Sequence, residues 1–258
     1  MKKPEVTLEN YEQVYDYYQQ YDQPMFGAKL GHYAMGLIFK PNTEFAPGAE
    51  DAVEAALQDD KTRTVVAFNH LSDNDQYVVS AMAIKEPAFK PMVGNTFIQS
   101  KEPLFHHPNK ILRPFLRRGV DIMGAIPAFR KKDVDDSSAD LRRLATARML
   151  ETSVQKIRDG KFMAIFPEGT RNKENPEQVQ PLRPGISAVI GQTATTHEVN
   201  IIPVGFTYEH NKHKPQMRVE MPELYSNIGE SELLPWLQTS LQHAVDSARL
   251  QALIRTNK

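Results

Sequence analysis

The sequence predicts an α/β fold, with a mostly parallel or mixed central sheet flanked by helices and amphipathic helices at the N-terminus. Short β-branched or apolar runs of strand length alternate with longer segments of helical periodicity. The chain has 258 residues and contains no Pro/Gly/Ser-rich linker and no internal repeat. We therefore expect one α/β domain over residues 46–258, preceded by a helical segment at residues 1–45.

The N-terminal segment carries two apolar stripes at helical spacing. The first expected helix covers residues 7–22, and its stripe consists of Leu8, Tyr11, Tyr15 and Tyr18. The second follows Pro24, and its apolar face consists of Phe26, Leu30, Tyr33, Ala34, Leu37 and Ile38. Such stripes are typical both of helices packed on a core and of helices lying on a membrane, so residues 1–45 are a candidate membrane-docking element.

The domain that follows is expected to alternate strands and helices. Gly160 is placed to end its longest helix, and Pro184 is placed to open a later one. Ser72 and Asp75 have the spacing of a capping box, which predicts a helix start ahead of QYVVSAMAI. The expected strands are residues 64–69, 91–99, 121–129, 161–166, 200–209 and 216–225, and the expected helices are residues 48–60, 76–84, 138–159, 186–193 and a C-terminal one from Ser231.

Composition excludes several classes of function. The formal net charge of −1 provides no bulk positive field for nucleic acid, although basic residues between 110 and 143 form either a local cationic face or a solvated surface. The absence of cysteine excludes disulfides, thiolate metal sites and a cysteine nucleophile. The N-terminus lacks the apolar core of a secretory signal, and no apolar run approaches the roughly 20 residues of a spanning helix. We expect a cytoplasmic protein that does not cross a membrane.

The segment AFNHLSDNDQYVV, at residues 67–79, places His70 on an expected strand-to-helix turn. Ligands of α/β sheets bind at the carboxyl ends of the strands. A histidine becomes a general base when a carboxylate holds its other ring nitrogen. Asp75 can reach back to His70 across such a turn and Asp73 is the competing partner, while a capped strand end with a structural histidine is the alternative.

A second segment, FPEGTR at residues 166–171, follows the expected buried strand at 161–166. Arg171 offers a planar fork of donors that suits a phosphate group. The alternative is an ordinary Pro-Gly turn with an exposed arginine.

Together the two segments resemble the glycerolipid acyltransferase family, which is typified by 1-acylglycerol-3-phosphate acyltransferase. The first block of that family, N-H-x-S-x-x-D, is matched by Asn69, His70, Ser72 and Asp75. Its third block, F-P-E-G-T-R, is matched at every position. The looser second and fourth blocks resemble KEPLF at 101–105 with GAIPAFR at 124–130, and IIPVGF at 201–206.

The resemblance implies a role for each matched residue. His70 would be the general base that deprotonates a glycerol hydroxyl, and Asp75 would orient it. Arg130 and Arg171 would bind the acceptor's phosphate, with Lys101 as a weaker candidate. Glu168 would orient Arg171 or accept from a hydroxyl, and the substrate-binding turn would include Gly169 and Thr170. Backbone amides after His70 would stabilise the oxyanion.

The resemblance also implies the partners. The acyl donor would be acyl-CoA or acyl carrier protein, the acceptor would be a lysophospholipid, and neither a metal nor another cofactor is required. Because acceptor and product are lipids, we expect a peripheral protein on the cytoplasmic face of a membrane. The sequence does not choose among lysophosphatidate, glycerol-3-phosphate, another lysophospholipid and a glycolipid.

Two other classes of protein are alternatives. A metal-dependent hydrolase would use His70, Asp73 and Asp75 with a histidine from His106, His107 or His210. A non-catalytic protein that binds lipids or a membrane surface would keep the scaffold without turnover.

Overall fold

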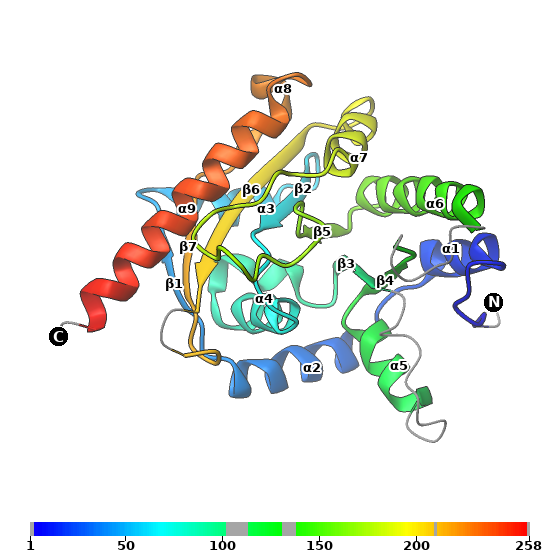
Figure 1. Ribbon diagram of the computed structural model, residues 1–258, viewed down its shortest axis with the longest axis horizontal. Coiled ribbons are helices and arrows are strands. Elements are labelled where there is room, and N and C mark those ends of the chain that lie inside the picture. The colour runs from blue at the N-terminus through cyan, green and yellow to red at the C-terminus, as the bar shows by residue number, and fades with distance from the viewer. Residues whose placement is uncertain (1–2, 102–112, 131–137, 209–210, 257–258) are drawn as a thin grey trace.

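The computed structural model describes residues 3–101, 113–130, 138–208 and 211–256. Within these residues, eight strands form one sheet with helices on both faces (Figure 1). Seven strands follow one another in the order β1-β7-β6-β2-β5-β3-β4, and β8 pairs with β6. The strands are β1 (Asn42–Phe45), β2 (Arg63–Phe68), β3 (Thr96–Lys101), β4 (Ala125–Ala128), β5 (Phe162–Ile165), β6 (Val199–Thr207), β7 (Gln216–Val219) and β8 (Glu223–Leu224).

The sheet is mixed and mostly parallel, as the sequence predicts. Strands β6, β2, β5, β3 and β4 are neighbours in that order and all run parallel. Only the pairings of β6 with β7 and with β8 are antiparallel among the described strands. The carboxyl ends of five adjacent strands therefore meet at one edge of the sheet.

The helices form a layer on each face of the sheet. Alternate side chains of β2 point to opposite layers, because Val65 and Ala67 belong to one buried cluster and Val66 and Phe68 to the other. In Figure 1, α9, α7 and α6 lie above the sheet and α4 and α2 below it. The helices are α1 (Tyr11–Gln20), α2 (Met25–Ile38), α3 (Ala49–Gln58), α4 (Asp75–Lys85), the 3₁₀ helix η1 (Pro87–Met92), α5 (Arg113–Ile122), α6 (Ala139–Arg158), α7 (Gly185–Ala194), α8 (Tyr225–Ile228) and α9 (Leu233–Thr256).

Other structure occupies part of three expected strands. The strand expected at 91–99 begins only at Thr96, because η1 occupies residues up to Met92. The strand expected at 121–129 begins at Ala125, because α5 continues through Ile122 and Gly124 turns the chain with a φ of 77°. The strand expected at 216–225 divides into β7 and β8, with Pro222 between them. The structure also contains β1, for which the sequence predicts no strand.

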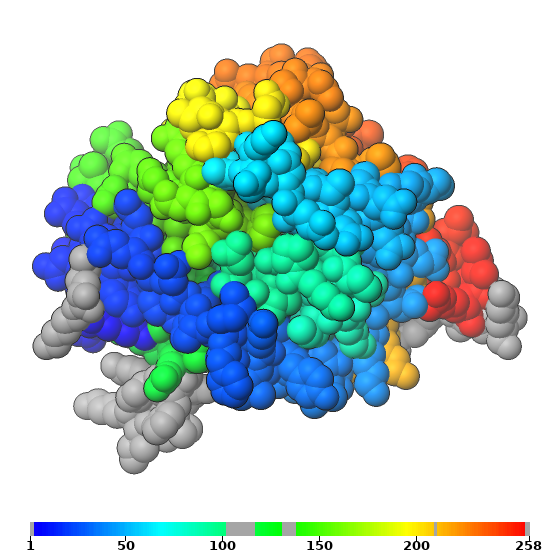
Figure 2. Space-filling model, turned by 180° about the vertical axis from the view of Figure 1, so that it is seen from behind, coloured from blue at the N-terminus to red at the C-terminus, as the bar shows by residue number. Residues whose placement is uncertain are grey.

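The two N-terminal helices have opposite environments. Helix α1 begins at Tyr11 rather than residue 7, and it buries Tyr15 and Tyr18 in the core (0% and 1% exposed). Helix α2 instead packs against α4 with small residues such as Ala28 buried, and most of its large apolar side chains are exposed. Figure 2 shows α2 at the surface along the lower edge of the molecule. The exposed residues are Met25, Phe26, Leu30, Tyr33, Leu37 and Ile38.

Candidate active site

A cavity of about 370 Å³ opens at the carboxyl ends of the parallel strands. Strand β2 ends just before His70, β3 ends at Lys101, and β4 ends just before Arg130. The turn after β5 contributes Gly169 and Arg171. All of these residues line the cavity, so the structure brings together site residues that the sequence predicts from three separate blocks.

His70 and Asp75 form a hydrogen-bonded pair. The Nδ1 atom of His70 lies 2.8 Å from Oδ2 of Asp75, and the Asp75 side chain is fully buried while that of His70 is 22% exposed. The choice between two aspartates is thereby resolved in favour of Asp75. Asp73 points instead toward Lys101 and Arg171.

The Asp75 carboxylate is held by three further donors. Its Oδ2 atom accepts from the backbone N–H groups of Leu71 (2.6 Å) and Ser72 (2.8 Å), and its Oδ1 atom accepts from the Tyr208 hydroxyl (2.8 Å). Burial raises the pKa of Tyr208, which keeps its hydroxyl protonated as a donor. The carboxylate is therefore fixed in the orientation that the His70 ring requires.

The expected capping box is only half present. Asp75 reaches back to the Ser72 amide, as the acid of a capping box does, but the Ser72 hydroxyl accepts from the Asn74 amide. Helix α4 consequently begins at Asp75, with Asn74 rather than Ser72 at its N-cap position. The short turn places Asp75 on the first turn of the helix, directly beside His70.

The turn after β5 fixes the backbone and ring of His70. Glu168 accepts from the His70 amide at 2.6 Å, and the Asn172 amide donates to the His70 carbonyl at 2.7 Å. The Phe166 ring stacks on the imidazole, with centroids 4.4 Å apart. The FPEGTR turn therefore supports the histidine as well as contributing Arg171.

Glu168 has a different role from the one implied by the family resemblance. It is 1% exposed, and its second oxygen accepts from the Gln180 amide at 2.9 Å. Burial raises the pKa of Glu168, although these hydrogen bonds act in the opposite direction. Its contacts are thus with backbone amides rather than with Arg171 or the cavity, which makes it a residue that positions His70.

Three cations face the cavity. Lys101, Arg130 and Arg171 line it together with Gly169, and Thr170 is not among the lining residues. Gly169 has a φ of 67°, a conformation that favours glycine and lets the turn bring Arg171 toward the cavity. The rest of KEPLF, and residues 110–112 and 131–137 of the basic region, lie outside the described residues.

Backbone amides after His70 were expected to stabilise the oxyanion, but those nearest to the end of β2 are already occupied. The amides of His70, Leu71, Ser72 and Asn74 already donate to side-chain oxygens of Glu168, Asp75 and Ser72. These groups serve to hold the site together and are not directed at a substrate.

Two further residues support the site. The sequence predicts no role for Asn69, and it does not indicate Tyr208 at all. Asn69 belongs to the N-H-x-S-x-x-D block. Its side chain forms two hydrogen bonds with the backbone of Phe206, at 3.0 and 2.9 Å, which join the end of β2 to β6. Tyr208 directly follows β6, and no local pattern marks it. Only the parallel pairing of β2 with β6 indicates that it lies near His70.

The metal hypothesis gains no support from the described residues. They contain no group of three or more His, Asp or Glu side chains arranged to hold a metal ion. The histidines His106, His107 and His210 lie outside these residues.

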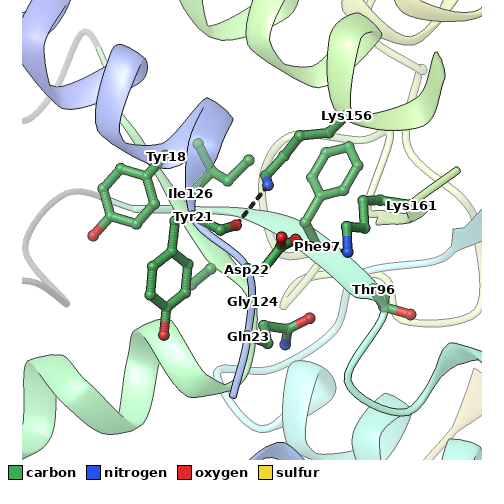
Figure 3. Close-up of a pocket in the computed structure, with 11 residues that line it drawn as sticks. Tyr18, Tyr21, Asp22, Gln23, Thr96, Phe97, Gly124, Ile126, Lys156 and Lys161 are labelled. Carbon is green, nitrogen blue, oxygen red and sulfur yellow. Dashed lines mark hydrogen bonds and ion pairs between the residues drawn. The ribbon is translucent and has the colours of Figure 1, made fainter. Parts of the chain in front are cut away.

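A second, smaller crevice lies at the opposite edge of the sheet (Figure 3). It is lined by residues that begin β3 and β4, including Thr96 and Ala125. The Lys156 ammonium donates there to the Tyr21 carbonyl at 2.9 Å, and Lys161 pairs with Asp22 at 2.7 Å. These contacts fasten the N-terminal segment to the domain and do not involve the His70 site.

The described helices include none that is both long and apolar enough to cross a bilayer. This finding covers the part of the chain described by the structure.

The site combines a hydrogen-bonded His–Asp pair with cations at the carboxyl edge of an α/β sheet. A family model described as Acyltransferase matches residues 48–207, which include His70, Asp75 and the FPEGTR turn. The chain belongs to this family of glycerolipid acyltransferases, which join an acyl donor to a lipid acceptor. A comparison with curated proteins gave no match.

Proposed function

We propose that the protein transfers a fatty acyl chain from acyl-CoA or acyl carrier protein to the hydroxyl of a phosphorylated glycerol. The acceptor we favour is 1-acylglycerol-3-phosphate, which would give phosphatidate. The observation that carries this proposal is the 2.8 Å pair of His70 and Asp75 in a cavity that Lys101, Arg130 and Arg171 also line.

The geometry supports a direct transfer. Because Nδ1 of His70 bonds to the Asp75 carboxylate, Nε2 is the nitrogen that takes the proton from the acceptor hydroxyl. The oxygen attacks the thioester carbonyl, the carbon–sulfur bond breaks, and the imidazolium returns the proton to the leaving thiolate. Asp75 stabilises the imidazolium between these steps. The reaction requires no protein nucleophile and no cofactor.

The cations support a phosphorylated acceptor. Arg171 offers paired donors that match phosphate oxygens, and Lys101 and Arg130 add two positive charges to the same cavity. Gly169 and Thr170 belong to the turn that carries Arg171. An acceptor phosphate bound there would hold its glycerol beside His70.

The test is a panel of acceptors with both donors, read by mass spectrometry of the product. The panel contains lysophosphatidate, glycerol-3-phosphate, another lysophospholipid and a glycolipid. We expect turnover that survives EDTA and is fastest with a phosphorylated glycerol. Loss of activity in EDTA would favour a metal-dependent enzyme, and no turnover with any pair would favour a lipid-binding protein.

We also propose that α2 docks the protein on an anionic bilayer. Its outward side chains include Phe26, Leu30 and Leu37, which are 82%, 60% and 61% exposed. Exposed Lys29 and Lys90 line an apolar groove beside them. Apolar insertion combined with lysines that attract anionic lipids is typical of interfacial helices. The cytoplasmic leaflet has such lipids, and we place the protein there.

Two aromatic side chains connect the end of α2 to the wall of the cavity. Phe39, directly after α2, stacks on Tyr77 of α4 with ring centroids 6.2 Å apart. Tyr77 lines the cavity that holds His70. The proposed docking face and the His70 cavity are therefore linked through one pair of packed rings.

A further inference from the structure

Asp73 lies among the cations of the cavity. Its Oδ1 atom is 3.0 Å from the Lys101 ammonium, and its Oδ2 atom pairs with the Arg171 guanidinium. The Asp73 side chain is 61% exposed, whereas those of Lys101 and Arg171 are 30% and 21% exposed. The carboxylate therefore occupies, from the solvent side, a position between two of the groups expected to bind phosphate.

We propose that Asp73 is a specificity-determining residue that competes with the headgroup of the acceptor. Its carboxylate neutralises Lys101 and Arg171 until the acceptor binds, and the acceptor's phosphate then displaces it. This inference rests on the proposed function, because it assigns these two cations to the acceptor. Beyond that function, we infer that the Asp73 carboxylate sets the affinity of the site for phosphate.

Charge makes Asp73 an effective competitor at neutral pH. Partial desolvation acts to raise the pKa of Asp73, but the hydrogen bond from Lys101 and the charges of Lys101, Arg171 and Lys173 outweigh it and lower that pKa. At neutral pH the side chain is thus a carboxylate and the acceptor's phosphate is an anion. Any anion that binds both cations must first break two ion pairs.

The exchange is energetically accessible. Exposed ion pairs such as these are individually weak, because water screens them. A phosphomonoester carries about −1.5 to −2 charges and three acceptor oxygens, so it gains more from the same cations than one carboxylate does. Since Asp73 is mostly exposed, it can turn into water when the phosphate arrives and can pair again when the product leaves.

A different role for Asp73 makes the opposite prediction. If its carboxylate served to hold Lys101 and Arg171 in the correct orientation, removal of its charge would weaken phosphate binding. Asp73→Asn distinguishes the two roles by the sign of the change, because the amide keeps the size of the side chain and removes its charge.

The test is isothermal titration calorimetry, which measures the affinity of the full chain for inorganic phosphate and for glycerol-3-phosphate at low ionic strength. We expect Asp73→Asn to bind both about two- to thirtyfold more tightly, the range given by two exposed ion pairs. Asp16→Asn is the matched control, since Asp16 pairs with Arg148 at 2.6 Å outside the cavity and is 48% exposed. Its phosphate affinity should equal that of the unchanged protein.

Unchanged, weaker or undetectable phosphate binding in Asp73→Asn would overturn the inference. Turnover distinguishes this failure from a failure of the proposed function. With a phosphorylated acceptor, Asp73→Asn should lower the acceptor KM, whereas the KM for an uncharged monoacylglycerol should not change. If tighter phosphate binding occurred without any acyl transfer, the competition would stand and the proposed reaction would not.

Discussion

At the scale of single residues, the site is organised around one carboxylate. Asp75 accepts four hydrogen bonds, from the His70 ring, two backbone amides and the Tyr208 hydroxyl. A carboxylate fixed in this way keeps the imidazole in one tautomer and one orientation. Tyr208 donates to the other oxygen of this carboxylate. Its hydroxyl can be removed with little change in side-chain volume, so it offers a clean test of this geometry.

Tyr208→Phe should lower kcat roughly tenfold and leave the acceptor KM nearly unchanged. The substitution removes one donor to a buried carboxylate, and a hydrogen bond to a charged group contributes about 1.5–3 kcal/mol. Steady-state kinetics would check it. The control is Tyr15→Phe, which removes a buried 2.9 Å hydrogen bond to the Pro127 carbonyl elsewhere. Equal kcat values in the two variants would show that Tyr208 does not position Asp75 for catalysis.

The burial of Lys156 makes the stability of the fold depend on pH. Burial lowers the pKa of its ammonium from 10.5 to about 8. Between these pH values the unfolded chain binds more protons than the folded one, so this group destabilises the fold at neutral pH and the penalty disappears as pH rises. The free energy of unfolding, compared with that of Lys156→Met, should therefore increase from pH 8 to 10.5, by up to about 3 kcal/mol.

Denaturant titrations at several pH values would measure this difference. Lys61→Met serves as the control, because Lys61 is exposed. The free energy of unfolding of this variant should differ from that of the unchanged protein by the same amount at every pH. A flat difference for Lys156→Met would mean that the Lys156 ammonium is not penalised by burial.

At the scale of elements, sequence periodicity predicted that the N-terminal helices exist but not where their apolar faces point. The two stripes have the same spacing, yet Tyr15 and Tyr18 of α1 are buried while Phe26 and Leu30 of α2 are exposed. Periodicity measures how apolar residues are distributed around a helix and carries no information on what covers them. In α2 Gly36 faces Ile84 of α4, while Gly27 faces Ile122 at the end of α5, an arrangement that depends on the three-dimensional packing.

The exposed face of α2 gives a prediction about membranes. Replacing Phe26, Leu30 and Leu37 together by serine should abolish sedimentation with anionic liposomes, because the change removes most of the apolar area available for insertion. Deletion of residues 1–39 is a poor test, since it removes the buried residues of α1. The control is the triple serine variant at the exposed apolar residues of α9, which are Leu250, Leu253 and Ile254.

The control variant should sediment like the unchanged protein. If the α2 variant still bound liposomes and the α9 variant did not, α9 would be the docking element.

The contact of β6 with α9 gives a prediction about stability. A Cβ atom at Gly205 would lie 2.4 Å from the backbone nitrogen of Val245 on α9. Gly205→Ala should therefore lower the free energy of unfolding by about 1–3 kcal/mol, as overpacking does. Gly119→Ala is the comparison, because it lies in helix α5 with open space around it and alanine favours a helix. Similar thermal unfolding of the two variants would contradict this packing.

At the scale of the whole molecule, the order of the strands assembles the site. The neighbours β6, β2, β5, β3 and β4 run parallel, so residues that are far apart in the sequence meet at one edge (Figure 1). The sequence predicted His70, Asp75 and Arg171 because each lies in a motif at a strand end. It could not predict Tyr208, which lies 133 positions from Asp75 and outside any motif, nor that Glu168 turns inward.

The central claim is that His70 is the base of an acyl transfer, and thiol release from acyl-CoA with lysophosphatidate tests it most directly. We expect His70→Ala to release thiol at least about a hundredfold more slowly than the unchanged protein, the lower end of the contribution of general base catalysis. His243→Ala should keep the full rate, since His243 is 67% exposed and lies outside the cavity lining. Full activity in His70→Ala would contradict the account.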